Sequence, residues 1–150
     1  MLGAVANAIA LTAAVVSLTP RTMPAEDAIP LTAFGIDADG GLSNRRVFAE
    51  GLGPDGICLD AEGAVWAGTG GFSVARVAPG GEVLQRVELP ENRAPFALML
   101  GGPDRRTLFI LTAEWRLADG HVDNLDRLAN GPRTGQILTL PVSVPGAGRP

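Results

Sequence analysis

The chain has 150 residues, of which 19% are charged, and its formal net charge is −4. A chain of this length buries one core, so one folded domain is expected, and its acidic balance argues against nucleic acid, which binds a basic face. The 20 glycines and 12 prolines indicate many turns between short apolar runs, a pattern typical of an all-β chain.

Residues 1–30 form a divergent apolar N-terminal segment, ahead of a β domain expected over residues 31–150. The apolar run at the start is slightly short for a membrane span and lacks the positive start of a secretory signal. Pro20, Pro24 and Pro30 exclude a long helix. We expect no membrane association and a cytoplasmic location. Export through a signal-like segment and an altered gene start are the alternatives.

A regular pattern begins at residue 31. Residues 31–36 and 42–48 predict two strands, joined by a turn at residues 37–40. Asp37 and Asp39 are spaced as in a calcium loop, but the rest of the EF-hand spacing is absent. We interpret this segment as a turn.

A hairpin is predicted next. Ile57-Cys58-Leu59 is a short apolar strand, Asp60-Ala61-Glu62-Gly63 has the Asp and Gly of a type I turn, and a strand restarts at Val65. Cys58 is the single cysteine, which excludes an internal disulfide and a cysteine zinc site. Between two aliphatic neighbours it is interpreted as a small core residue and not as a nucleophile.

Asp55 lies just before this hairpin, between Pro54 and Gly56. Proline restricts φ and glycine permits unusual backbone angles, so the carboxylate is held where a strand begins. A carboxylate held in this way can ligate a metal or act as a base. It can also simply cap a turn, and the residues alone leave these alternatives open.

The glycine cluster at residues 68–71 follows a predicted strand, as a phosphate-binding loop would. Residues 73–77 then alternate like a strand and not like a helix, which excludes a dinucleotide fingerprint. A further strand is predicted at residues 82–89.

The last part of the chain repeats the unit, with strands predicted at residues 95–100, 107–112 and 135–140. Residues 114–134 are interpreted as a solvated loop. A metal cluster of His121, Asp123, Asp126 and Asn130 is the alternative. A Ser-His-Asp triad would have to use His121, and no nucleophile motif lies near it.

Paired strands recur at a spacing of about 40 residues, which is typical of propeller blades of about 40–50 residues. The segments 34–47 and 76–87 share a strand, a glycine-containing turn and a strand, and the pairs that begin at Ile57 and Leu98 repeat likewise. The chain therefore predicts about three blades, whereas a closed ring has about 4 to 8.

An ordered set of motifs carries a resemblance to a known family. It comprises Pro54-Asp55-Gly56, the apolar strand after it, Asp60-x-x-Gly63 and Trp66, with segments 31–34, 42–47, 76–83 and 100–104. This set resembles the C-terminal half of the regucalcin/gluconolactonase (senescence marker protein-like) family. The resemblance implies a truncated, all-β, partial six-bladed β-propeller of about three blades, each an antiparallel four-stranded sheet.

The resemblance also implies site residues. In the family the Asp of Pro-Asp-Gly binds a divalent cation, so Asp55 is expected to be a metal ligand and the catalytic carboxylate. Residues 5–12 are similar to a family strand whose Asn is another ligand, which makes Asn7 a second candidate, although Ala8 replaces a family Gly. An apolar segment that happens to hold an Asn is the alternative. Calcium is the expected cation, with zinc or magnesium as alternatives.

The function implied by the resemblance is metal-dependent hydrolysis of a small-molecule sugar lactone. The alternative is a non-catalytic propeller fragment that acts as a binding or assembly module. The last blade shows three strands and no fourth, so open blade edges and apolar faces are expected to favour a homo-oligomer.

Overall fold

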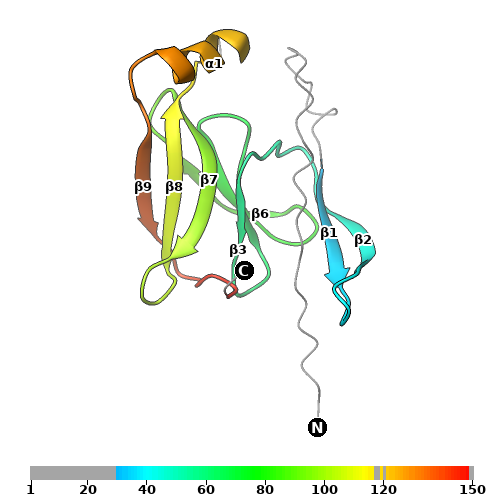
Figure 1. The fold of residues 1–150 in the computed structure, drawn as a ribbon. Coiled ribbons are helices and arrows are strands. Elements are labelled where there is room, and N and C mark those ends of the chain that lie inside the picture. Colours follow the sequence, from blue (N-terminus) through cyan, green and yellow to red (C-terminus); the bar gives the residue numbers. More distant parts are fainter. Residues whose placement is uncertain (1–29, 117–118, 120, 149–150) are drawn as a thin grey trace.

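The computed structural model describes residues 30–116, 119 and 121–148, in which antiparallel strands form three successive sheets (Figure 1). The first sheet pairs β1 (Leu31–Ile36) with β2 (Leu42–Ala49). The second sheet has the strand order β3 (Ile57–Leu59), β4 (Val65–Gly68), β5 (Ser73–Val77) and β6 (Val83–Glu88). The third sheet has the strand order β7 (Arg93–Gly101), β8 (Thr107–Glu114) and β9 (Gln136–Pro141). The expected all-β class is confirmed. Four strands are present in the second sheet, and the other two sheets have fewer within the described residues.

The expected boundary at residue 30 stays a prediction, because residues 1–29 lie outside the described residues. Within the described part, consecutive strands pair as neighbours in each sheet, and all strands of one sheet precede those of the next in the sequence. This order is the one expected for consecutive blades of a propeller.

Three of the hairpin turns share one geometry, at residues 37–41, 60–64 and 78–82. In each, the first residue donates its N–H to the carbonyl of the fifth, at 2.9, 2.9 and 2.8 Å, and the fourth donates to the carbonyl of the first, at 2.9, 3.1 and 3.0 Å. The fourth residue is a glycine with positive φ, at 85° in Gly40, 80° in Gly63 and 92° in Gly81. A type I turn followed by a left-handed residue is a common hairpin connection and explains these glycines.

The interpretation of Asp37 and Asp39 as turn residues agrees with the structure. Asp39 Oδ1 accepts a hydrogen bond from the N–H of Gly41 at 2.9 Å, and Asp37 Oδ1 accepts one from the Ser43 hydroxyl at 2.7 Å. Both carboxylates therefore stabilise the turn between β1 and β2.

Two layers of apolar side chains hold the three sheets together. Between the first and second sheets lie Leu31, Ala33, Phe48, Ala49, Leu52, Val65, Ala67, Ala75 and Val77. Between the second and third lie Trp66, Val74, Leu98, Leu100, Leu108 and Ile110. Alternate side chains of the central sheet thus enter different layers, and this sheet is buried on both faces.

The expectation of a solvated loop over residues 114–134 is wrong, because this segment contains helix α1 (His121–Asn130). The helix lies beyond the end of the third sheet (Figure 1). Asn124 is only 1% exposed, and its side-chain amide accepts from the N–H of Arg116 and donates to its carbonyl, both at 2.9 Å. This contact anchors the helix to the segment that follows β8. No helix of the described part is long and apolar enough to cross a membrane.

Candidate functional site

Asp55 lies two residues before β3, at the junction of the second and third sheets. β3 is the end strand of its sheet and contacts β7, the first strand of the next sheet. The approach is close at Gly56, where a Cβ atom would lie 2.5 Å from Cα of Ala97 and 2.7 Å from the carbonyl oxygen of Phe96. Only a residue without a side chain fits there. The glycine after Asp55 therefore allows β3 and β7, the first strands of the second and third sheets, to contact each other.

The Asp55 side chain is exposed and has no hydrogen-bond or ion-pair partner among the described residues. Although exposed, it has lost part of its hydration to the neighbouring protein, and this burial raises its pKa above the ordinary value of 3.8. The shift has no contribution from a charged neighbour. An unpaired carboxylate with a raised pKa is a candidate for proton transfer or for ligand binding.

The donor atoms of Asp55 suit a hard divalent cation, which prefers oxygen ligands. Among the side chains that the structure describes, however, no three of His, Cys, Asp or Glu gather closely enough to hold a metal ion. Ca²⁺ takes about 6–8 oxygen ligands, so Asp55 can supply only part of its shell. Asn7, the second expected ligand, lies outside the described residues.

The turn after β3 is fixed by a charge cluster whose role the sequence did not reveal. Asp60 is 1% exposed, and its Oδ1 accepts from the N–H groups of Glu62 and Ala64 at 2.9 and 3.0 Å. Arg76 on β5 donates from Nε to Asp60 Oδ2 at 2.6 Å and from a terminal nitrogen to Glu62 at 2.7 Å. The hydrogen bond with Asp60 raises the pKa of Arg76. This cluster holds β3, and with it the segment that carries Asp55.

The C-terminal segment reinforces the same hairpin. Gly146 forms an isolated bridge with Asp60, Ala61 donates its N–H to the Pro145 carbonyl at 2.8 Å, and Ala147 donates to the Leu59 carbonyl at 3.1 Å. A chain segment that follows the third sheet therefore returns to the second.

Cys58 on β3 is partly buried and packs against the layer between the second and third sheets. Burial raises the pKa of its thiol to about 12. The thiol is therefore protonated at neutral pH, and because the thiolate is the nucleophilic form, the structure agrees with the interpretation of Cys58 as a core residue.

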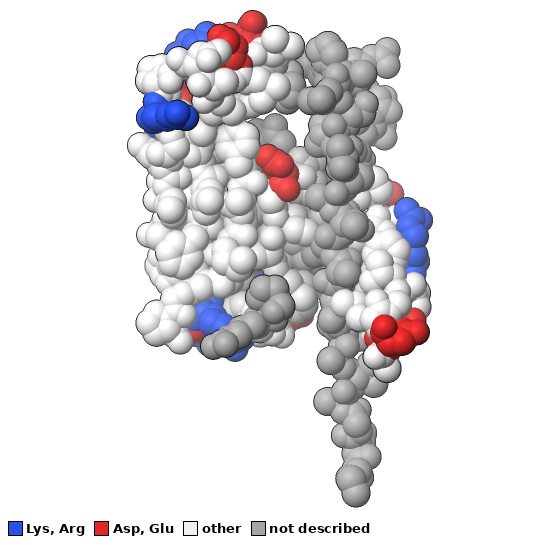
Figure 2. Space-filling model, in the orientation of Figure 1, with Lys and Arg blue, Asp and Glu red and all other residues white. Residues whose placement is uncertain are grey.

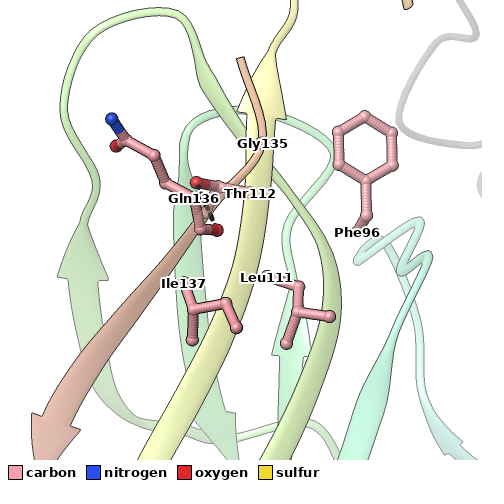
Figure 3. Close-up of a pocket in the computed structure, with 6 residues that line it drawn as sticks. All are labelled: Phe96, Leu111, Thr112, Gly135, Gln136 and Ile137. Carbon is pink, nitrogen blue, oxygen red and sulfur yellow. Dashed lines mark hydrogen bonds between the residues drawn. The ribbon is translucent and has the colours of Figure 1, made fainter. Parts of the chain in front are cut away.

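A shallow hollow of about 320 Å³ lies on the third sheet. Figure 3 shows its lining, in which Leu111 and Ile137 lie side by side on β8 and β9 and Phe96 stands apart from them. The hydroxyl of Thr112 donates to the backbone carbonyl of Gln136 at 3.3 Å, so these two polar groups already have a partner. The hollow therefore offers mainly apolar contact, and the alternation of apolar residues in β8 is the sequence signal that could have revealed it.

The chain is similar in sequence to a known protein family. The family model described as SMP-30/Gluconolactonase/LRE-like region matches residues 23–114. The 6-deoxy-6-sulfogluconolactonase of Pseudomonas putida is 36% identical over 127 residues, which cover 80% of this chain and 41% of that protein. Regucalcin of Xenopus laevis is 34% identical over 107 residues, 65% of this chain and 35% of that protein. The chain thus spans about two-fifths of the length of the curated relatives it matches.

Solved structures show the same likeness. A luciferin-regenerating enzyme superposes with a TM-score of 0.59 at 20% identity, over 78% of this chain and 39% of its own, which shows a common fold. A calcium-binding protein, regucalcin from Agrobacterium tumefaciens, superposes with a TM-score of 0.58 at 25% identity, over 79% of this chain and 40% of its own.

Proposed function

The chain belongs to the SMP-30/gluconolactonase/LRE-like family, and from this premise we propose that it serves the hydrolysis of a sugar lactone, with Asp55 as the carboxylate of the site. The observation that carries the proposal is the environment of Asp55. Its carboxylate is exposed and has no partner among the described residues, and burial raises its pKa. It lies where β3 contacts β7. The name of the Pseudomonas relative, a sulfogluconolactonase, supports the substrate class.

The proposed reaction is addition of water to the lactone carbonyl. A bond forms between the water oxygen and the carbonyl carbon, the ring C–O bond breaks, and the product is an open-chain hydroxy acid. Asp55 would accept the proton that the water loses and return it to the ring oxygen as that bond breaks. In the cation-free protein burial raises the pKa of Asp55 above its ordinary value, a direction that favours acceptance of a proton.

A divalent cation is part of the proposal, with calcium preferred and zinc or magnesium as alternatives. When bound, such a cation supplies Lewis acidity that polarises the lactone carbonyl. Asp55 would provide one oxygen ligand, and Asn7 is the proposed second. The printed description of the Agrobacterium relative as a calcium-binding protein supports a hard cation. A cytoplasmic location stays a prediction within this proposal.

The test is release of acid from glucono-δ-lactone, measured above the spontaneous rate, with added Ca²⁺ and after treatment with a chelator. We expect Asp55→Asn to lower the rate by about 10²–10⁴-fold, the usual contribution of a general base. The matched control is Asp104→Asn in the turn between β7 and β8, where Asp104 Oδ1 only accepts the N–H of Arg106 at 3.1 Å. The control should keep the wild-type rate.

Two outcomes would contradict different parts of the proposal. If the wild-type rate equals the spontaneous rate, the chain does not hydrolyse this lactone. If the wild-type rate exceeds the spontaneous rate and Asp55→Asn keeps it, the chain is active but Asp55 is not part of the site.

The alternative function, a non-catalytic binding or assembly module, is favoured by a different observation. Several large apolar side chains on the third sheet are exposed, among them Ile137 at 66% and Met99 at 53%. This surface is independent of Asp55 and can act whether or not the chain is an enzyme.

A further inference from the structure

The end of helix α1 carries an Asn-Gly pair, Asn130-Gly131, whereas every other asparagine of the sequence precedes Ala, Arg or Leu. An asparagine before glycine is prone to deamidation, because glycine has no side chain that shields its own backbone nitrogen from the neighbouring side-chain amide. Asn130 is exposed, and in Figure 2 acidic and basic side chains gather on the surface over α1. Water therefore reaches this pair.

Two hydrogen bonds hold the groups of this pair that would react. The backbone N–H of Gly131 donates to the carbonyl of Arg127 at 2.9 Å. The side-chain amide of Asn130 donates to Oδ1 of Asp126 at 2.6 Å. Deamidation needs a Gly131 nitrogen that has lost its proton and an Asn130 amide that has turned toward it, so both hydrogen bonds oppose the reaction.

The way in which α1 ends requires the glycine. A Cβ atom on residue 131 would lie 2.5 Å from the carbonyl oxygen of Arg127, so a side chain there would displace the last turn of the helix. Pro132 follows and disfavours continuation of the helix. The reactive pair is therefore a consequence of this helix end.

We propose that Asn130 is a deamidation site that the last turn of α1 keeps closed and that reacts when this turn opens. The backbone nitrogen of Gly131 forms a bond to Cγ of Asn130, the bond from Cγ to the amide nitrogen breaks, and ammonia leaves with the proton of the Gly131 N–H. Water then opens the cyclic imide to aspartate or isoaspartate. Water is the single co-reactant, and the reaction is independent of Asp55.

The product opposes closure of the same turn. A carboxylate at residue 130 lies at the C-terminal end of a helix, where negative charge is unfavourable, and it replaces the donor to Asp126 by a like charge. The segment that follows the helix is tied to the third sheet, because the Thr134 hydroxyl accepts the N–H of Glu114 at 3.1 Å. Deamidation should therefore loosen α1 close to its attachment to the sheet.

The test is mass spectrometry of the peptide that contains Asn130, after incubation of the full 150-residue chain at mildly alkaline pH. Wild type is compared in the folded state and in urea. Deamidation should be at least about tenfold slower in the folded state, because it requires local opening of the helix end. Amide hydrogen exchange of α1 should then be faster in the deamidated fraction than in the unmodified protein.

Asp126→Ala should accelerate deamidation of the folded protein about two- to tenfold, the effect of losing one hydrogen bond on an opening equilibrium. Alanine favours a helix more than aspartate does, so faster deamidation would not come from lower helix propensity. Asp126→Asn is the matched control, because its side-chain oxygen still accepts a hydrogen bond, and it should stay close to the wild-type rate. In urea the three proteins should react at the same rate.

Three outcomes would overturn the proposal. The first is wild type that deamidates as fast when folded as in urea, because the helix end then gives no protection. The second is a folded Asp126→Ala variant that reacts no faster than wild type. The third is a chain in urea that deamidates at other asparagines before Asn130.

Discussion

At the scale of single residues, Asp60 illustrates how a turn residue acquires a second role from the fold. Its carboxylate accepts two backbone N–H groups and also binds Arg76, which comes from a different strand. The side chain of Asp60 is 0% exposed and that of Arg76 is 13% exposed, so the pair is shielded from water. Glu62, the other partner of Arg76, is 65% exposed.

Asp60→Ala should destabilise the protein by about 3–5 kcal/mol, because it leaves a shielded guanidinium and two backbone N–H groups without partners. Glu62→Ala should cost only about 0–1 kcal/mol, since solvent screens an exposed ion pair. Urea unfolding of the two variants beside wild type measures both. Equal costs would show that Asp60 contributes no more than a surface pair.

Asp55→Asn should have the opposite effect on stability. Burial raises the pKa of Asp55, so the folded protein holds this proton more tightly than the unfolded chain does, and the ionised carboxylate lowers stability at neutral pH. The variant should therefore unfold at a slightly higher temperature than wild type at pH 7. The difference should shrink as the pH falls through the raised pKa and vanish below the ordinary value of 3.8, where both states of wild type are protonated.

Thermal unfolding at several pH values checks this expectation, with Asp104→Asn as the control for loss of a charge. A variant less stable than wild type at pH 7 would mean that the Asp55 carboxylate stabilises the fold, and it would argue against a carboxylate kept for function.

At the scale of elements, the contact between β3 and β7 depends on the absence of a side chain. A Cβ atom on Gly56 would meet backbone atoms of β7 at 2.5 and 2.7 Å, and backbone cannot move aside as the tip of a side chain can. The two first strands would have to separate, which disturbs the layer between the second and third sheets.

Gly56→Ala should therefore destabilise the protein by about 1–3 kcal/mol, the usual cost of overpacking. Gly71→Ala is the matched control, since a Cβ atom there meets nothing within 4 Å. It should be neutral or stabilise by up to about 1 kcal/mol by restricting the unfolded chain. Chemical unfolding of both variants gives the comparison, and a Gly56→Ala variant as stable as the control would show that β3 and β7 are not tightly packed.

At the scale of the whole molecule, the described residues form three successive sheets joined by two apolar layers. Because side chains of the second sheet enter both layers, this sheet couples the first sheet to the third.

The sequence by itself determined the strands, their order and the three hairpin turns with their glycines, because these depend on apolar runs and on backbone angles of residues close together in the chain. It also singled out Asp55, through flanking Pro54 and Gly56. Tertiary structure alone decided that Gly56 faces Ala97, that Asp60 binds Arg76 and that Asn124 anchors a helix where a loop was expected. Each of these depends on contacts between separate elements, and local patterns carry no information about which distant backbone or charge will lie opposite. The apolar alternation of β7–β9 likewise indicates two apolar faces, but only the tertiary structure decides which one packs against the second sheet.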